Sequence, residues 1–228
     1  MEDLLGQHLT LTASDGHTLG AYRADPAGTP KGGIVVIQEI FGVNSHIRNV
    51  TDRFAAEGYV AIAPALFDRQ ERNFESGYSP DEIAHARKFI ANPDWDAMLR
   101  DTQAAIDAIK SAGPVAIVGF CMGGSIAFLA ATRLSGLAAA VGYYGGAIAR
   151  NADEKPKVSV QLHFGAQDQG IPLSDVEIIR EKRPEIEVHV YDEAGHGFGC
   201  DERSAYHKPS AELAGSRTRN FLTRHLKK

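Results

Sequence analysis

The sequence predicts an α/β fold, with helices on both faces of a mostly parallel central sheet, in a single domain spanning residues 1–228. Two short runs, residues 33–37 and 115–118, are apolar throughout, as strands that are buried on both faces require. Strand-like and helix-like segments alternate along the chain, which is typical of βαβ units. With 228 residues, 43% of them hydrophobic, the chain can bury a sizeable core.

The chain begins with a hairpin and continues into the first parallel strands. Residues 9–12 and 18–22 alternate in polarity around a Ser-Asp-Gly turn, which predicts two paired strands. The apolar run at 33–37 follows as a central strand. A helical stretch from about residue 44 to 57 and a strand at 59–63 complete this half.

The same alternation continues to the end of the chain. An amphipathic helix at 94–112 precedes the buried strand at 115–118. Further helices are predicted at 125–133, 173–182 and about 209–225, and further strands at 138–144, 158–164 and 187–191. Because such sheets bind ligands beyond the carboxyl ends of their strands, we expect functional residues in the loops that follow the strands.

Charge and cysteine content exclude several classes of protein. The chain has 24 Lys and Arg against 29 Asp and Glu, a net charge of −5, without the basic cluster that nucleic-acid binders need. Its apolar runs are far shorter than the roughly 20 residues that span a membrane. The acidic start Met1-Glu2-Asp3 differs from a signal peptide, and two cysteines make no disulfide framework. We therefore expect a soluble cytoplasmic protein.

The most informative motif is Gly119-Phe120-Cys121-Met122-Gly123, between a buried strand and a helix. It matches the G-x-S-x-G nucleophile elbow, with cysteine in the place of serine. Where a strand turns directly into a helix, the neighbouring backbone segments come very close together. Small residues are therefore needed two positions before and two positions after the central residue. The central thiol projects at a helix N-terminus, whose positive end favours a thiolate. The alternative is a tight glycine turn that holds an inert cysteine.

Two later residues could complete a catalytic triad. Asp168 follows the strand at 158–164 and His196 follows the strand at 187–191, so both lie in loops at the ligand-binding edge. The chain order of nucleophile, acid and histidine is the order found in folds with such an elbow. Asp168 could instead cap a turn, and His196 could be an ordinary loop histidine, but their joint occurrence favours the triad.

Together these motifs resemble the dienelactone hydrolase family of the α/β-hydrolase superfamily, over about residues 32–222. Besides the elbow, the resemblance rests on Gln38-Glu39-Ile40-Phe41-Gly42, Ala63-Pro64-Ala65-Leu66-Phe67, Ala140-Val141-Gly142-Tyr143-Tyr144-Gly145 and Gly195-His196-Gly197-Phe198. It implies that Cys121 is the nucleophile, His196 its base and Asp168 the acid that orients the histidine.

The resemblance also implies roles for the segment after the strand at 33–37. Glu39 matches the family glutamate that contacts the nucleophile in the resting enzyme and changes position when substrate binds. A turn acid is the alternative for Glu39. The backbone N–H groups of Ile40 and Met122 are the expected oxyanion hole, the usual pair in this fold.

Relatives that open dienelactones hold the substrate carboxylate with two arginines, and this sequence departs from that pattern. The position of one arginine, just beyond the catalytic histidine, is occupied by Cys200. For the other, Arg87 is the candidate on a predicted helix, although a solvated helix charge is an equal alternative. Arg69 and Arg72 in the preceding loop could also face the cleft. With one arginine lost, we predict that a carboxylate-bearing lactone is preferred to its neutral counterpart by about tenfold or less.

The expected activity is hydrolysis of an enol lactone or activated ester through a Cys121 acyl-enzyme. A general carboxylesterase or thioesterase using the same residues is the alternative, followed by a non-catalytic ligand-binding relative. The partner is a small-molecule substrate, for which Tyr143, Phe198 and Cys200 are candidate contacts, with core packing as the alternative for Tyr143. No metal or cofactor is expected, because no H-E-x-x-H or C-x-x-C spacing is present. The oligomeric state stays open and is compatible with a monomer.

Overall fold

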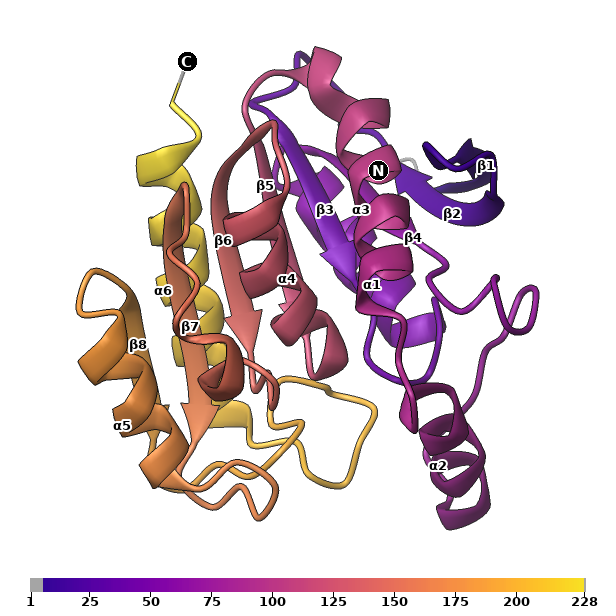
Figure 1. Ribbon diagram of the computed structural model, residues 1–228. Coiled ribbons are helices and arrows are strands. Elements are labelled where there is room, and N and C mark those ends of the chain that lie inside the picture. The colour runs from indigo at the N-terminus through magenta and orange to yellow at the C-terminus, as the bar shows by residue number, and fades with distance from the viewer. Residues whose placement is uncertain (1–5, 228) are drawn as a thin grey trace.

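One eight-stranded sheet runs through the structure, a computed structural model in which residues 6–227 are described (Figure 1). The acidic start Met1-Glu2-Asp3 lies outside the described residues. The strands follow the order β1-β2-β4-β3-β5-β6-β7-β8 across the sheet. They comprise β1 (Gln7–Thr12), β2 (Thr18–Ala24), β3 (Gly33–Ile37), β4 (Val60–Pro64), β5 (Val115–Phe120), β6 (Leu137–Tyr143), β7 (Ser159–Gly165) and β8 (Glu187–Tyr191).

The pairing of the strands confirms the predicted mostly parallel sheet. The β1–β2 hairpin is antiparallel, and β2 also pairs antiparallel with β4. Every other neighbouring pair is parallel. Strands β3, β4 and β5 are buried at every position, which explains why their sequences are continuously apolar rather than alternating.

Helices cover the sheet on both sides, as predicted (Figure 1). Helices α3 and α4 pack against each other and against the central strands, whereas α1 and α6 cover the opposite face. Every residue of α4 from Met122 to Thr132 is buried. The helix lacks a distinct polar face, as a helix that is enclosed on all sides requires. The helices are α1 (Ser45–Ala56), α2 (Pro80–Ala86), α3 (Trp95–Ile109), α4 (Met122–Arg133), α5 (Leu173–Lys182) and α6 (Lys208–His225), with short 3₁₀ turns η1 (Arg87–Ile90), η2 (Lys110–Ala112) and η3 (Ala149–Asn151).

Small differences from the prediction occur where strands meet the ligand-binding edge. Helix α4 begins at Met122 rather than at residue 125, so it starts immediately after the cysteine of the elbow. Strand β6 ends at Tyr143, and Tyr144 has a positive φ of 38° outside the strand. Arg87 lies just beyond α2, in the 3₁₀ turn η1. Strand β6 therefore ends one residue before its predicted end, whereas β4, β5 and β7 extend one or two residues beyond theirs.

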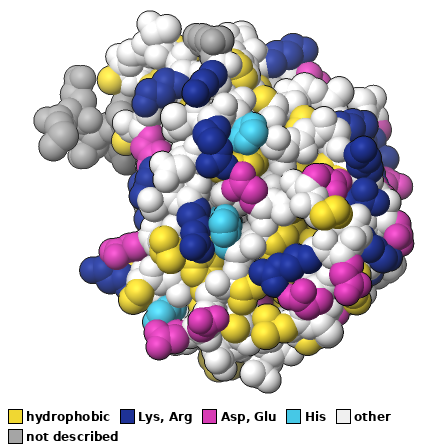
Figure 2. Space-filling model, turned by 90° about the vertical axis from the view of Figure 1, so that its left-hand side faces the viewer, with side chains coloured by type: hydrophobic (Ala, Val, Ile, Leu, Met, Phe, Trp, Pro, Cys, Tyr) yellow, Lys and Arg dark blue, Asp and Glu magenta, His cyan; other side chains and the backbone are white. Residues whose placement is uncertain are grey.

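The surface matches the mixed charge of the sequence. On the face shown in Figure 2, basic and acidic side chains are interspersed rather than gathered into one continuous patch of either sign. Among residues 6–227, no helix is both long and apolar enough to cross a membrane.

Candidate active site

The turn between β5 and α4 places Cys121 at the edge of the sheet. Cys121 has a φ of 54° and a ψ of −117°, a strained conformation for a residue with a side chain. A methyl group on Gly119 would collide with the carbonyl of Gly123, so the glycines allow strand and helix to approach so closely. The backbone N–H of Cys121 donates to the carbonyl of Tyr143 at 3.0 Å, which fixes the turn against β6. The thiol is partly exposed.

Loops after β7 and β8 bring Asp168 and His196 to the same edge. His196 Nε2 lies 3.1 Å from Cys121 Sγ, and His196 Nδ1 lies 2.7 Å from Asp168 Oδ2. Asp168 Oδ1 accepts hydrogen bonds from the backbone N–H groups of Gly170 at 2.8 Å and Ile171 at 3.2 Å, so the carboxylate is fixed from both sides. The structure thus brings the three predicted residues into one hydrogen-bonded chain.

The surroundings of His196 favour a positive imidazolium. Burial alone would lower the pKa of His196, but the hydrogen bonds with Asp168 and Cys121 outweigh burial and raise this pKa to about 10. An imidazolium beside the thiol stabilises a thiolate, which is the reactive form of cysteine. The His196 side chain is 33% exposed, so a ligand in the cleft can reach it.

Glu39 follows β3 and makes an ion pair that the sequence analysis missed. Arg203 Nη1 donates to Glu39 Oε1 at 3.1 Å, and the two side chains are 17% and 2% exposed. The Arg203 guanidinium also lies over the rings of Phe41 and Tyr78, with 5.3 Å and 5.9 Å to their centroids. A buried carboxylate requires a cation, and a guanidinium satisfies it better than a neutral thiol. Among the described residues no hydrogen bond joins Glu39 to Cys121, and the expected contact of Glu39 with the nucleophile stays a prediction.

Arg203 also corrects the sequence analysis of the arginines. The Arg203 guanidinium packs against Gly197, the residue that follows His196. A side chain at position 197 would collide with the guanidinium. Although Cys200 occupies the expected arginine position, the same loop supplies Arg203 instead. The expectation that this side of the site lacks an arginine is wrong.

Cys200 itself is fully buried and not reactive. Burial raises the pKa of the Cys200 thiol to about 12, so the group stays protonated at neutral pH. Its Sγ donates to the Tyr78 hydroxyl at 3.4 Å, and that hydroxyl also accepts from Asn44 Nδ2 at 3.0 Å. Cys200 thus links its loop to the segment before α2 and offers no surface to a substrate.

The other predicted substrate contacts are mostly core residues. Phe198 is fully buried and packs against Tyr144 and Tyr191, which leaves no surface for a ligand in this conformation. Tyr143 is buried, with its hydroxyl 2.6 Å from Thr218 Oγ1. Burial therefore contradicts the expectation of a substrate contact at Phe198 and at Cys200, and favours the packing alternative for Tyr143.

The remaining predicted arginines lie in different surroundings. Arg69 binds Asp101 at 2.7 Å and Asp15 at 3.0 Å, so it ties α3 to the β1–β2 hairpin. Arg72 donates to the carbonyl of Thr18 at 2.8 Å, also in that hairpin. Arg87 is exposed. Arg69 and Arg72 are thus engaged with the hairpin, and only Arg87 is left as a candidate on that side of the site.

The two expected oxyanion donors are the backbone N–H groups of Met122, which follows Cys121 in the chain, and of Ile40, in the loop after β3. Met122 is the first residue of α4, so its N–H has no acceptor within the helix. Ile40 follows Glu39 in the buried loop after β3 and is itself buried. Their role in binding an oxyanion stays a prediction.

Tyr144 lies beside His196, at a position for which no role was predicted. Its ring centroid is 5.1 Å from that of His196, and its buried hydroxyl has no hydrogen-bond partner among the described residues. In the sequence Tyr144 is the last residue of the strand predicted at 138–144, which gives its side chain no direction toward the site. The described residues contain no cluster of three or more His, Cys, Asp or Glu side chains that could hold a metal ion.

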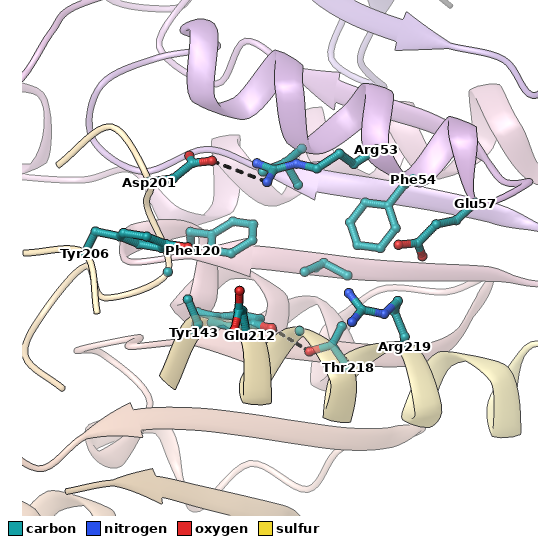
Figure 3. Close-up of a pocket in the computed structure, with 15 residues that line it drawn as sticks. Arg53, Phe54, Glu57, Phe120, Tyr143, Asp201, Tyr206, Glu212, Thr218 and Arg219 are labelled. Atoms are coloured by element: carbon teal, nitrogen blue, oxygen red, sulfur yellow. Dashed lines mark hydrogen bonds and ion pairs between the residues drawn. The ribbon is translucent and has the colours of Figure 1, made fainter. Parts of the chain in front are cut away.

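A separate cavity of about 260 Å³ lies between α1 and α6 (Figure 3). None of Cys121, Asp168 and His196 lines it. Its floor includes Phe120 and Tyr143, and one wall includes Asp201 and Tyr206, from the irregular segment between the His196 turn and α6. This segment, residues 199–206, therefore borders the cavity with some residues and reaches Glu39 with another, Arg203.

Comparisons with known proteins identify the family of this chain. A model of the dienelactone hydrolase family matches residues 19–226. The carboxymethylenebutenolidase of Pseudomonas putida is 34% identical and covers 96% of this chain and 97% of its own. A Synechocystis protein with a provisional carboxymethylenebutenolidase name is 38% identical, over 92% of this chain and 93% of its own. A crystal structure of a provisionally named dienelactone hydrolase from Klebsiella pneumoniae has a TM-score of 0.82 at 31% identity, over 93% and 96% of the two chains.

Proposed function

This chain belongs to the dienelactone hydrolase family, as a carboxymethylenebutenolidase-like hydrolase, and we propose that it opens a small enol lactone that carries a carboxylate. The observation that carries the proposal is the buried Glu39–Arg203 pair beside the Cys121–His196 contact. It combines an activated thiol with a guanidinium that can bind an anionic substrate. A carboxylate on the lactone would orient the ring so that its carbonyl faces the thiol.

The proposed reaction proceeds through an acyl-enzyme on Cys121. His196 takes the thiol proton, and the thiolate attacks the lactone carbonyl to form a tetrahedral intermediate. The backbone N–H groups of Ile40 and Met122 bind its oxyanion. The ring C–O bond then breaks, and the enolate leaves with the proton that His196 took from the thiol, which produces a thioester and a neutral histidine. His196 next deprotonates a water molecule that attacks the thioester, and this proton returns to the Cys121 sulfur as the C–S bond breaks and the acid is released.

Glu39 and Arg203 connect substrate charge to this chemistry. The guanidinium of Arg203 can bind either Glu39 or a substrate carboxylate at full strength. When an anionic substrate binds Arg203, Glu39 loses its cation, and its carboxylate becomes a second acceptor for the Cys121 proton. The enzyme would then be most reactive when the correct anion is bound.

The nucleophile limits the substrates further. A thiolate leaves a tetrahedral intermediate easily, so the other leaving group must be at least comparable. Enol lactones, aryl esters and thioesters meet this requirement, whereas amides and simple alkyl esters do not. A general carboxylesterase or thioesterase would use the same residues but would show no preference for an anion.

We also propose that the protein acts in the reducing cytoplasm on a small-molecule substrate. Both cysteines are free thiols, and the proposed nucleophile requires a reduced sulfur. No oligomeric partner is needed for the site, because every residue of the proposed mechanism comes from one chain.

A hydrolysis screen tests the proposal. The substrates are a carboxylate-bearing enol lactone, its neutral methyl ester, a p-nitrophenyl ester and an acyl thioester, each with wild type and with Cys121→Ala. We expect the anionic lactone to have the highest kcat/KM, and mass spectrometry to detect an acyl adduct on Cys121. Equal rates on all substrates would favour the general esterase. Full activity of Cys121→Ala would remove Cys121 from the mechanism.

A further inference from the structure

Arg203 lies on the irregular segment 199–206, and a helix on the far side of that segment holds it in place. Asp201 Oδ1 lies 3.0 Å from His46 Nδ1, on the first turn of α1. Glu202 Oε2 accepts a hydrogen bond from Ser45 Oγ at 2.6 Å. The next residue, Arg203, points the other way, toward Glu39. Adjacent residues of one loop therefore bind α1 and the active site.

His46 is an unusual residue to bury for packing alone. Its side chain is 1% exposed, and its Nε2 has no hydrogen-bond partner among the described residues. To donate to Asp201, Nδ1 must carry the proton, which leaves an unpaired acceptor at a buried Nε2. The ring contacts Phe120 edge-on, with 6.0 Å between centroids. Among residues 6–227, the polar contact of this side chain is with the Asp201 carboxylate, 155 positions away in the sequence.

The loop needs an external anchor because its own backbone forms neither helix nor strand. Arginine has many rotamers, and a guanidinium that clamps a carboxylate must be held within about 0.5 Å of its working position. The Arg53 contact to the same Asp201 is longer, 3.4 Å, and the Arg53 side chain is 57% exposed (Figure 3). Of the two contacts that α1 makes with Asp201, the His46 contact is therefore the shorter and the more deeply buried.

We infer that His46 and Asp201 are positioning residues that hold Arg203 at the substrate carboxylate. They touch neither substrate nor thiol, and they act through the position of the loop. The effect on substrate rests on the proposed function, whereas the effect on the loop does not. Cys200, which is buried within the same loop, reports the position of the loop independently of activity.

The main test replaces His46 in two ways. His46→Leu removes the donor, whereas His46→Asn keeps an N–H near the position of Nδ1. In His46→Leu we expect kcat/KM for the anionic lactone to fall at least tenfold, mainly through KM, and kcat/KM for the neutral p-nitrophenyl ester to stay within about twofold. His46→Asn should restore much of the loss.

A second readout measures thiol labelling of Cys200. In a Cys121→Ala background, the further change His46→Leu should make iodoacetamide modify Cys200 at least ten times faster, because the loop opens. Asp201→Ala, at a side chain that is 44% exposed, should give the same two effects without disturbing the core of α1. Arg53→Leu is the matched control, because it removes only the longer, exposed contact to Asp201 and should change neither quantity.

The outcomes separate the two proposals. Unchanged Cys200 labelling in both His46→Leu and Asp201→Ala would overturn the positioning role, whatever the substrate. Faster labelling without loss of anion preference would also overturn it, because the loop would then move without moving Arg203. If wild type shows no preference for the anion, the proposed substrate is wrong, and the labelling rates alone decide whether His46 holds the loop.

Discussion

The buried Glu39–Arg203 pair allows a quantitative prediction for Arg203→Met. Methionine keeps much of the apolar stem but removes the cation, which leaves the Glu39 carboxylate, 2% exposed, without a partner. Breaking a buried ion pair by removing one member costs about 3–5 kcal/mol. Because Arg203 is 17% exposed, we expect the lower end of this range, about 3 kcal/mol. For a chain of this size that is a loss of about 6–12 °C in Tm.

A double-mutant cycle with Glu39→Gln isolates the charge from the packing. In Arg203→Met with Glu39→Gln, no buried charge remains, so most of the lost stability should return, to within about 1 kcal/mol of wild type. The measurement is urea unfolding of all four proteins at pH 7, followed by two spectroscopic probes. The coupling between the two positions should be about 2–3 kcal/mol.

The control for this cycle is an exposed ion pair of similar length. Arg180 on α5 pairs with Glu177 at 2.6 Å, with side chains that are 41% and 56% exposed. Exposed pairs of this kind contribute less than about 1 kcal/mol, so Arg180→Met should be nearly neutral. If Arg203→Met were as mild as Arg180→Met, or if Glu39→Gln failed to rescue it, the argument from a buried carboxylate would be refuted.

Three other predictions follow from the site and the core. Asp168→Asn should lower kcat by roughly three to four orders of magnitude while the protein stays folded, because the histidine loses its orienting charge; steady-state rates and circular dichroism check this. Glu39→Gln should leave alkylation of Cys121 by iodoacetamide almost unchanged in the free enzyme, since Glu39 is bound to Arg203, but should slow the anionic lactone; a large fall in the alkylation rate would contradict the assignment. Burial lowers the pKa of His163, so the folded protein keeps this group neutral while the unfolded chain protonates it near pH 6.5. The resulting stability is present above that pH and is lost as the pH falls below it, by up to about 1.4 kcal/mol per pH unit, and His163→Gln should flatten this part of the unfolding free energy profile.

The sheet and the placement of Cys121, Asp168 and His196 could be predicted because strands carry strong local signals. Apolar runs such as 33–37 and 115–118 read directly as buried strands, and the ends of parallel strands meet at one edge. A residue that follows a strand end is therefore placed to within a few ångströms by topology alone. This is why the spacing of the three residues sufficed to bring them together.

Arg203 could not be predicted in the same way. It lies in a segment without periodic structure, where neither the direction nor the reach of a side chain follows from the pattern. The predicted substrate contacts at Cys200 and Phe198 failed for a related reason. A loop residue beside a catalytic histidine can be buried as readily as exposed, and both of these side chains are buried. Only the three-dimensional path of the loop decides which of its side chains reach the site.

The buried Glu39 carboxylate explains why this loop must carry a cation even though the expected position holds a cysteine. Glu39 is fixed by the end of β3 and is almost fully enclosed, so it needs a cation wherever the chain can provide one. At the position where an arginine was expected, this chain has Cys200, whose buried thiol cannot neutralise a carboxylate. Arg203, on the same loop, supplies the charge instead. Glu39 thus requires a positive charge next to its carboxylate, and any cationic loop residue that reaches the carboxylate can provide this charge.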